Sequence, residues 1–218
     1  MAVLRKSALV HSSIFFRVKL VRLWLKGCLL PNLTPEFDGL PELSDLYVHY
    51  SSTLKPHLNS GQLDTLGALI SGSPSLRKLD VTIDPDVPGL MLKISAPRLR
   101  HMVIESWSAD WMVEFQSQLP FISSAKLRLP VSRYIQEGGS KLVHILQSIS
   151  RVQRLELHDA SQLDNFQDMM PIKIPVTFEK LQYFSTNVDL GCAPHIAFVV
   201  HLLRSCPNIR DIEIKVDT

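Results

Sequence analysis

One apolar pattern recurs along almost the whole chain and limits how the chain can fold. Each copy holds an apolar residue, two variable residues, an apolar residue, one variable residue and a further apolar residue. The last three positions have the period-two alternation of a strand whose two apolar side chains share one face. The eight copies are Leu20-Leu23-Leu25, Leu43-Leu46-Val48, Leu76-Leu79-Val81, Leu99-Met102-Ile104, Ser124-Leu127-Leu129, Val152-Leu155-Leu157, Leu181-Phe184-Thr186 and Ile209-Ile212-Ile214. Two copies are weak, because Ser124 replaces a first apolar residue and Thr186 a last one.

The segments between the copies favour helices in three places. Residues 62–71, 141–150 and 194–205 have apolar residues at the i, i+3, i+4, i+7 spacing of a one-sided helix. Proline stands two residues before the first apolar position at Pro41, Pro74, Pro97 and Pro207. Its fixed φ and missing N–H end a helix and begin an extended segment. Strands that alternate with such return segments predict right-handed crossovers and a parallel sheet.

The repeat also predicts how the units are arranged. A single unit cannot bury its own apolar face, so neighbouring units must stack. The copies begin 23 to 33 residues apart, close to the 20 to 29 residue period of leucine-rich repeats, and the first copy continues to a buried-type Cys28. We expect an α/β leucine-rich-repeat solenoid of about eight irregular repeats, with a curved parallel sheet on the concave side and helices and irregular segments on the convex side. Residues 1–17 are expected to form a poorly ordered lead-in, and residues 18–218 the repeat domain.

Composition agrees with a globular chain. Leucine makes up 33 of the 218 residues, and 23 Lys+Arg against 21 Asp+Glu leave a net charge of +2. This balance argues against disorder and against polyanion binding driven by net charge. Three cysteines are too few and too scattered for a disulfide framework, which favours a reducing compartment. We expect a cytoplasmic or nuclear protein with no secretory signal and no membrane span, since charged residues interrupt the apolar run 18–30.

The closest approach to a metal or nucleophile set is Cys192, His195, His201 and Cys206. His195 and His201 lie six residues apart on an expected helix, about 240° around its axis, so they would face different ways. No nucleophile and base come together elsewhere in the sequence. We therefore expect no catalytic residue, no metal site and no cofactor, and predict that the chain is not an enzyme.

The variable positions beside the apolar strand residues would line one face of the sheet. Their charges change sign along the row and include aromatic residues, which favours a protein partner over a nucleic acid, whose backbone calls for a uniformly basic stripe. The candidate partner-binding residues are Trp24, Tyr47, Lys78, Asp80, His101, Lys126, Arg128, Arg154, Glu156, Tyr183, Asp211 and Glu213. Each has the alternative of being a solvated strand position. Trp107 and Trp111 either pack onto the repeats or anchor a partner.

Several segments, taken in order, resemble the plant F-box/leucine-rich-repeat proteins of the type that carries an FBD region. They are residues 23–30, 35–43, 73–79, 94–102, 178–181 and 202–214. The resemblance covers about residues 18–216, and residues 176–218 resemble the closing repeats of that family. It implies that the repeats hold a protein to be ubiquitinated, while an F-box of some forty residues binds the adaptor of a cullin-based ligase.

The resemblance has one departure. Only about 17 residues precede the first copy, and residues 1–17 show no Leu-Pro start followed by an amphipathic helical run. We expect the F-box to be missing, and therefore no binding of the ligase adaptor by this chain. The function expected is a non-catalytic protein-interaction module, resembling the substrate-recognition repeats of an SCF-type ubiquitin ligase subunit. The alternative is a truncated or degenerate family member without a dedicated partner.

Overall fold

The computed structural model describes most of the chain, and within the described residues the fold is α/β. These residues are 2–9, 19–31, 33, 37–54, 57–84, 89–106, 111–129, 140–159, 175–188, 190–191 and 193–216. They form a nine-stranded parallel sheet, a two-stranded parallel sheet, three α-helices and a 3-10 turn, η2 (Ser52–Leu54). The predicted α/β class with a large parallel sheet is confirmed.

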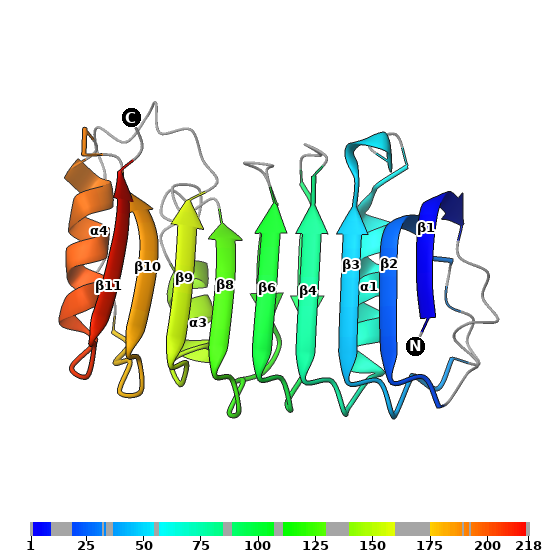
Figure 1. Ribbon diagram of the computed structural model, residues 1–218, viewed down its shortest axis with the longest axis horizontal. Helices are drawn as coiled ribbons and strands as arrows, with labels where there is room; N and C mark the ends of the chain where they lie inside the picture. The colour runs from blue at the N-terminus through cyan, green and yellow to red at the C-terminus, as the bar shows by residue number, and fades with distance from the viewer. Residues whose placement is uncertain are drawn as a thin grey trace.

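The large sheet follows the chain almost in sequence order, β1-β2-β3-β4-β6-β8-β9-β10-β11 (Figure 1). Its strands are β1 (Ala2–Leu9), β2 (Arg22–Leu29), β3 (Asp45–Tyr50), β4 (Lys78–Ile83), β6 (His101–Ser106), β8 (Ser124–Leu129), β9 (Arg154–Asp159), β10 (Tyr183–Val188) and β11 (Asp211–Val216). Every neighbouring pair is parallel. After each strand the chain therefore crosses back to the end of the sheet where that strand began, and the next strand starts there.

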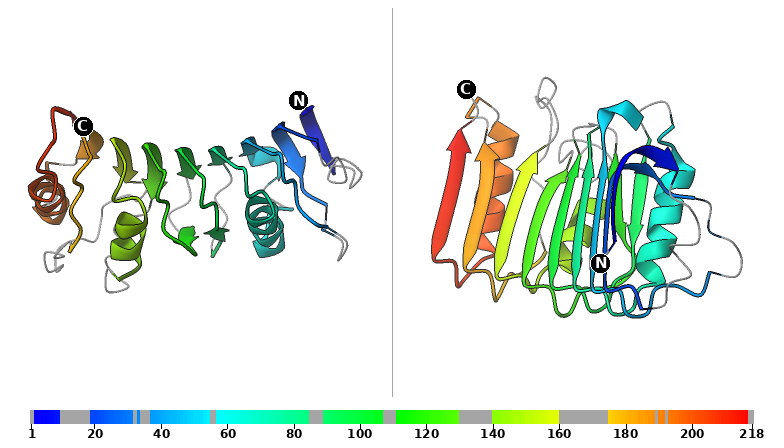
Figure 2. Two further views of the ribbon diagram at one scale, coloured as in Figure 1. Left: turned by 90° about the horizontal axis from the view of Figure 1, so that it is seen from below. Right: turned by 45° about the vertical axis from the view of Figure 1, so that its right-hand side comes forward.

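A second row of elements lies behind one face of this sheet. It contains the helices α1 (Ser60–Ser71), α3 (Ser140–Ser148) and α4 (Ala193–Arg204) and the short strands β5 (Met91–Ile94) and β7 (Met112–Phe115) (Figure 2). Strand β5 packs against α1 and pairs with β7, and β7 contacts α3. We call the opposite face of the large sheet the open face, because none of the described helices and strands covers it (Figure 2).

Seven units begin their strand through the same turn. In each, the N–H of the first apolar residue donates to the C=O three residues earlier, at 3.0 to 3.4 Å. The donor and acceptor pairs are Leu43–Leu40, Leu76–Ser73, Leu99–Ala96, Ile122–Leu119, Val152–Ile149, Leu181–Phe178 and Ile209–Cys206. The C=O of the residue after the first apolar position accepts hydrogen bonds from two N–H groups of the next unit. The C=O of Val21, for example, accepts from the N–H groups of Ser44 and Asp45. These bonds set neighbouring units in register before the strands begin.

The apolar strand residues point toward the helices and form one continuous core. From β2 to β10 their two rows are no more than 2% exposed. The rows are Leu23, Leu46, Leu79, Met102, Ala125, Leu155 and Phe184, and Leu25, Val48, Val81, Ile104, Leu127, Leu157 and Thr186. Trp111 is fully buried in the same core, which confirms the packing role for that residue, whereas Trp107 lies outside the described residues.

The three predicted helices are confirmed within two residues at each end, by α1, α3 and α4. The N-terminal edge differs from the prediction. The sequence predicts a poorly ordered lead-in over residues 1–17, whereas β1 pairs with β2 over the register Ala2–Leu23 to Leu9–Leu29. The sheet therefore has one strand more than the eight copies predict. The sequence of β1 lacks the three-residue apolar spacing, so the pattern misses it.

The copy assigned to Ser124 is wrong by two residues. Met102 pairs with Ala125 and Ile104 with Leu127, so the first apolar position of this unit is Ile122. The N–H of Ile122 makes the shared turn bond to Leu119. The small side chain of Ala125 hides the pattern. A shift of two residues preserves the face of a strand, and Lys126 and Arg128 therefore remain on the open face, each one position further along than expected.

Candidate partner-binding face

Three rows of side chains cross the open face. The first row is Arg22, Asp45, Lys78, His101, Ser124, Arg154, Tyr183 and Asp211, and the second is Trp24, Tyr47, Asp80, Val103, Lys126, Glu156, Ser185 and Glu213. The third is Lys26, His49, Thr82, Glu105, Arg128, His158, Asn187 and Lys215. All twelve candidate residues lie in these rows, and none of the twelve is buried. The structure therefore brings the whole predicted set onto one surface.

Two aromatic side chains dominate the N-terminal part of the face. The rings of Trp24 and Tyr47 are stacked with centroids 4.0 Å apart and planes inclined by 25°. Trp24 is 42% exposed, although indole is among the side chains that interfaces bury most often. The stacking restricts the rotation of both side chains.

Charged neighbours surround this stack. Arg22 lies 3.5 Å from Asp45, whose carboxylate also accepts a hydrogen bond from the Ser44 hydroxyl. Partial burial, followed by the Asp45 and Asp80 carboxylates, raises the pKa of the Tyr47 phenol. Tyr47 therefore remains a neutral hydroxyl at physiological pH, able to donate a hydrogen bond at the rim of the stack.

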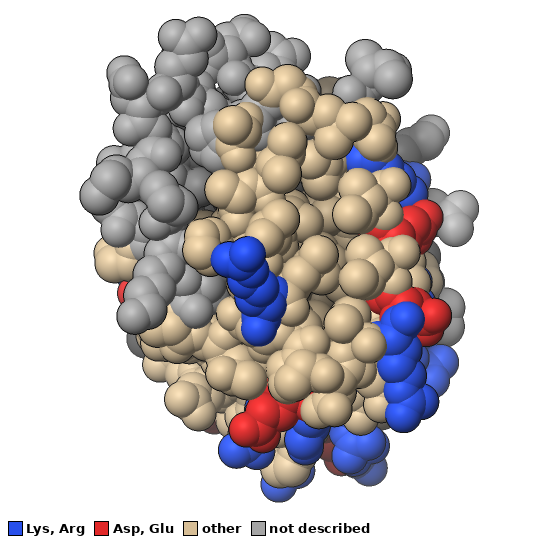
Figure 3. Space-filling view, turned by 90° about the vertical axis from the view of Figure 1, so that its left-hand side faces the viewer, with Lys and Arg blue, Asp and Glu red and all other residues tan. Residues whose placement is uncertain are grey.

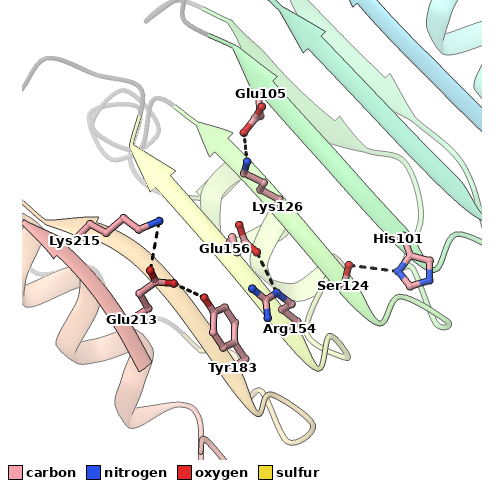
Figure 4. A network of polar contacts seen from close by, with 9 residues as sticks. All are labelled: His101, Glu105, Ser124, Lys126, Arg154, Glu156, Tyr183, Glu213 and Lys215. Atoms are coloured by element: carbon pink, nitrogen blue, oxygen red, sulfur yellow. Dashed lines mark hydrogen bonds and ion pairs between the residues drawn. The ribbon is translucent and has the colours of Figure 1, made fainter. Parts of the chain in front are cut away.

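The middle of the face holds cations and carboxylates side by side. The Lys126 ammonium on β8 lies 2.7 Å from the Glu105 carboxylate on the neighbouring β6. The His101 ring lies 3.4 Å from the Ser124 hydroxyl (Figure 4). Burial and the Glu105 carboxylate raise the pKa of Asp80. Lys78 has no ion-pair partner within the described part of the chain.

A connected network occupies the C-terminal part of the face (Figure 4). The guanidinium of Arg154 lies over the Tyr183 ring, 3.6 Å from its centroid, and bonds Glu156 at 3.0 Å. The Tyr183 hydroxyl donates to Glu213 at 2.5 Å, and Lys215 lies 3.6 Å from the same carboxylate. The hydrogen bond from Tyr183 lowers the pKa of Glu213 and raises that of Tyr183. Side chains of three strands, β9, β10 and β11, are therefore linked in one network.

Two histidines lie in the third row. His49 bonds Asp84 at 2.6 Å. Burial lowers the pKa of His158, and the nearby Arg128 and Lys126 add to this effect. Burial also lowers the pKa of His101, together with Lys78 and Arg100. The two lowered pKa values mean that His101 and His158 are neutral at physiological pH.

The described residues include thiol groups and side chains of the types that can bind metals. No group of three or more His, Cys, Asp or Glu side chains within the described ranges could hold a metal ion. Cys28 and Cys206 are buried, and burial raises the pKa of Cys206 to about 11, so its thiol is not an activated nucleophile. Cys192 and the side chain of His195, two of the metal ligands considered from the sequence, lie outside the described residues.

The sequence-based set missed several residues of the face. Arg22, Glu105, His158 and Lys215 take part in its contacts or shape its charge but were not chosen. Three of them belong to the third row, two residues beyond the last variable position inside each copy of the apolar pattern. Extending each copy by two residues, as the period-two alternation of a strand allows, would have found them.

Searches of protein-family models, of functionally characterised proteins and of solved structures find no match to this chain. None of the helices in the described residues is both long enough and apolar enough to cross a membrane.

Proposed function

We propose that this chain is a leucine-rich-repeat solenoid that binds another protein on its open face and catalyses no reaction. In this proposal the open face is the concave side of the solenoid. The repeated turn, the return elements on one side and the unbroken register of the strands support a solenoid. The observation that carries the proposed function is that two rows of open-face side chains, all but Asp45 and Ser185 solvent-accessible, stay in register across eight strands.

The chemistry of the rows favours a protein as partner. Cations and carboxylates alternate along the face, so no continuous basic stripe is available for a phosphate backbone. The exposed Trp24 and the Arg154–Tyr183 pair supply the aromatic and guanidinium groups in which protein interfaces are enriched. A partner with mixed charge and at least one apolar anchor would complement the face.

The resemblance to F-box/leucine-rich-repeat proteins adds a more specific proposal. The partner would be a protein presented for ubiquitination, and the chain would act in the cytosol or nucleus. The second candidate is a degenerate family member that retains the fold without a dedicated partner. Its support is that several charged side chains of the face already have a partner there, as expected for solvated strands, such as Lys126 with Glu105 and Arg154 with Glu156.

Co-purification with a matched charge control tests the proposal. Changing Lys126, Arg128 and Arg154 together to Glu should abolish co-purification of a bound protein, because the central cations become repulsive to the same acidic groups. Changing Lys93, Lys180 and Arg204 together to Glu alters the net charge equally, but at exposed positions outside the three rows, and should leave the partner bound. Circular dichroism of both variants checks that the fold is intact.

Photo-crosslinking locates the contact with the partner. One variant carries a benzophenone side chain at Val103 on the open face, and a separate variant carries it at Lys93 on β5. Crosslinking of the same protein from Val103 alone supports the proposal. Crosslinking from Lys93 alone contradicts it, and the absence of any specific partner favours the second candidate.

A further inference from the structure

Strand β11 forms the C-terminal edge of the sheet, and its apolar side chains are exposed. Ile212, Ile214 and Val216 occupy the positions that are buried in the preceding strands, yet they are 48%, 48% and 49% exposed. Helix α4 lies at the same end and adds the exposed Ile196 and Val200. Seen from this end, much of the described surface is uncharged; one cationic side chain lies near its middle, and the other charged side chains lie toward the lower and right-hand edges (Figure 3).

The backbone of β11 has a free edge. The N–H of Asp211 donates to the C=O of Gln182 at 2.9 Å, which directs the peptide groups of Asp211 toward β10. Peptide groups alternate in direction along a strand, so those of Ile212, Ile214 and Val216 point away from β10. Within the described residues no strand pairs with them. An unpaired edge with alternating apolar side chains is a template for one more strand.

The sequence of this edge is complementary to itself. In an antiparallel pair of two β11 strands centred on Ile214, Ile214 faces Ile214 and Ile212 faces Val216 of the second copy. These are the residues whose N–H and C=O groups point outward, so each pair exchanges both hydrogen bonds. Glu213 then faces Lys215 of the second copy, and Lys215 faces Glu213, which places opposite charges directly across the strands on the open-face side.

The other possible registers are worse. Centring the pair on Glu213 or Lys215 places like charges opposite each other, and centring it on Ile212 places Asp211 opposite Glu213. A shift of one residue brings isoleucine against a charged side chain and turns the apolar row to the wrong face. Among these registers, the one centred on Ile214 alone satisfies charge, apolar packing and backbone direction together.

We propose that two copies of this chain associate through β11, antiparallel, about a two-fold axis that passes by Ile214 perpendicular to the sheet. This closed isologous contact extends the sheet across the two copies. An axis in this direction keeps both open faces on the same side of the extended sheet and both α4 helices behind it. The exposed apolar side chains of Ile212, Ile214 and Val216 are covered by the same three residues of the second copy.

Sedimentation equilibrium of the purified full chain, over a wide range of concentration, tests the proposal. The wild-type chain should reach the mass of a dimer. Glu213→Lys places a lysine opposite Lys215 of the second copy, and Lys215→Glu places a glutamate opposite Glu213. Each single change should raise the dimer Kd about tenfold or more, because two attractive pairs become repulsive. The double variant exchanges the two charges, restores both pairs and should return the Kd to about the wild-type value.

Two further variants complete the test. Ile214→Lys puts two lysines against each other at the axis and should leave only monomer, with the circular dichroism spectrum unchanged because the side chain is exposed. Glu114→Lys changes an exposed glutamate on β7, away from this edge, and should leave the Kd unaltered. A wild-type chain that stays monomeric throughout overturns the proposal. So does a dimer that is insensitive to the single changes, or a double variant as weak as the single ones, since either places the contact elsewhere.

Discussion

Strands β4 and β11 carry the same apolar pattern in different surroundings. Leu79, Val81 and Ile83 of β4 are at most 1% exposed, whereas the corresponding residues of β11 are about half exposed. Strand β4 lies between β3 and β6, while β11 has β10 on one side only. The apolar strand residues of a unit are therefore buried by the neighbouring units on both sides and not by the unit itself.

Amide hydrogen exchange should show the largest difference between the two strands. The Val81 amide should exchange only through global unfolding, whereas the Ile214 amide should exchange with an opening free energy near zero in the monomeric chain. Within β11, Glu213 should exchange more slowly than Ile214, because its N–H points toward β10. Exchange followed by NMR at low protein concentration measures all three. Equal protection of Ile214 and Val81 in the monomer would contradict the comparison.

Truncation of apolar side chains should give the next largest difference between β4 and β11, in the free energy of unfolding. Leu79→Ala removes a fully buried side chain and should lower the free energy of unfolding by about 2 to 5 kcal/mol. Ile212→Ala removes a half-exposed one and should cost about 1 kcal/mol or less. Urea unfolding measures both. A loss under about 0.5 kcal/mol for Leu79→Ala would mean that the assigned core register is wrong.

Two glycines with positive φ differ in how closely the rest of the chain approaches them. Gly39 and Gly89 both have positive φ, +94° and +73°, but a Cβ on Gly39 would lie 2.1 Å from the C=O oxygen of Gly72, while one on Gly89 would meet nothing within 4 Å. Gly39→Ala should therefore cost about 2 to 4 kcal/mol, from backbone strain and overpacking together. Gly89→Ala should cost about 1 kcal/mol, from backbone strain alone. Equal losses in thermal melts would show that the approach of the two turns does not limit packing.

The smallest effect concerns the charge of the open face. His158 in the interior of the sheet has a pKa below the ordinary 6.5, owing to burial and then to Arg128 and Lys126. A lowered pKa in the folded state contributes stability that is complete above pH 6.5 and is lost as the pH falls through the folded-state value. Lys126→Gln should raise the pKa of His158 toward its ordinary value in an NMR titration. Lys93→Gln, on the other side of the sheet, should leave it unchanged, and an equal shift in both variants would exclude a local cause.

Most of the fold could be predicted because the repeat is carried by large apolar residues. The eight strands and three helices follow from period-two and period-3.6 spacing, which depend on local backbone geometry alone. The errors fall where that signal is weak. Ala125 is too small to mark its position, although Pro120, two residues before Ile122, follows the same proline rule as Pro41. Strands β5 and β7 are four residues long, too short for any periodicity to identify.

The candidate face was predictable in placement but not in its contacts. Alternation alone puts the twelve residues on one side of the sheet. The stack of Trp24 on Tyr47 and the bond from Tyr183 to Glu213 depend on which residues stand opposite each other in neighbouring strands. That pairing follows from the shared turn and from its bonds to the preceding unit, which the composition of a strand does not reveal.

The shared turn has a consequence for how such a chain tolerates insertions and deletions. Each unit is fixed to the one before it at the start of its strand, through the two N–H groups that follow its first apolar residue and donate to a carbonyl of the preceding unit. Residues gained or lost in the return segment leave these bonds untouched, and the units indeed differ in length by up to ten residues while their strands stay aligned. Length changes are therefore absorbed behind the sheet or beyond the ends of its strands, and the spacing of side chains on the open face is preserved.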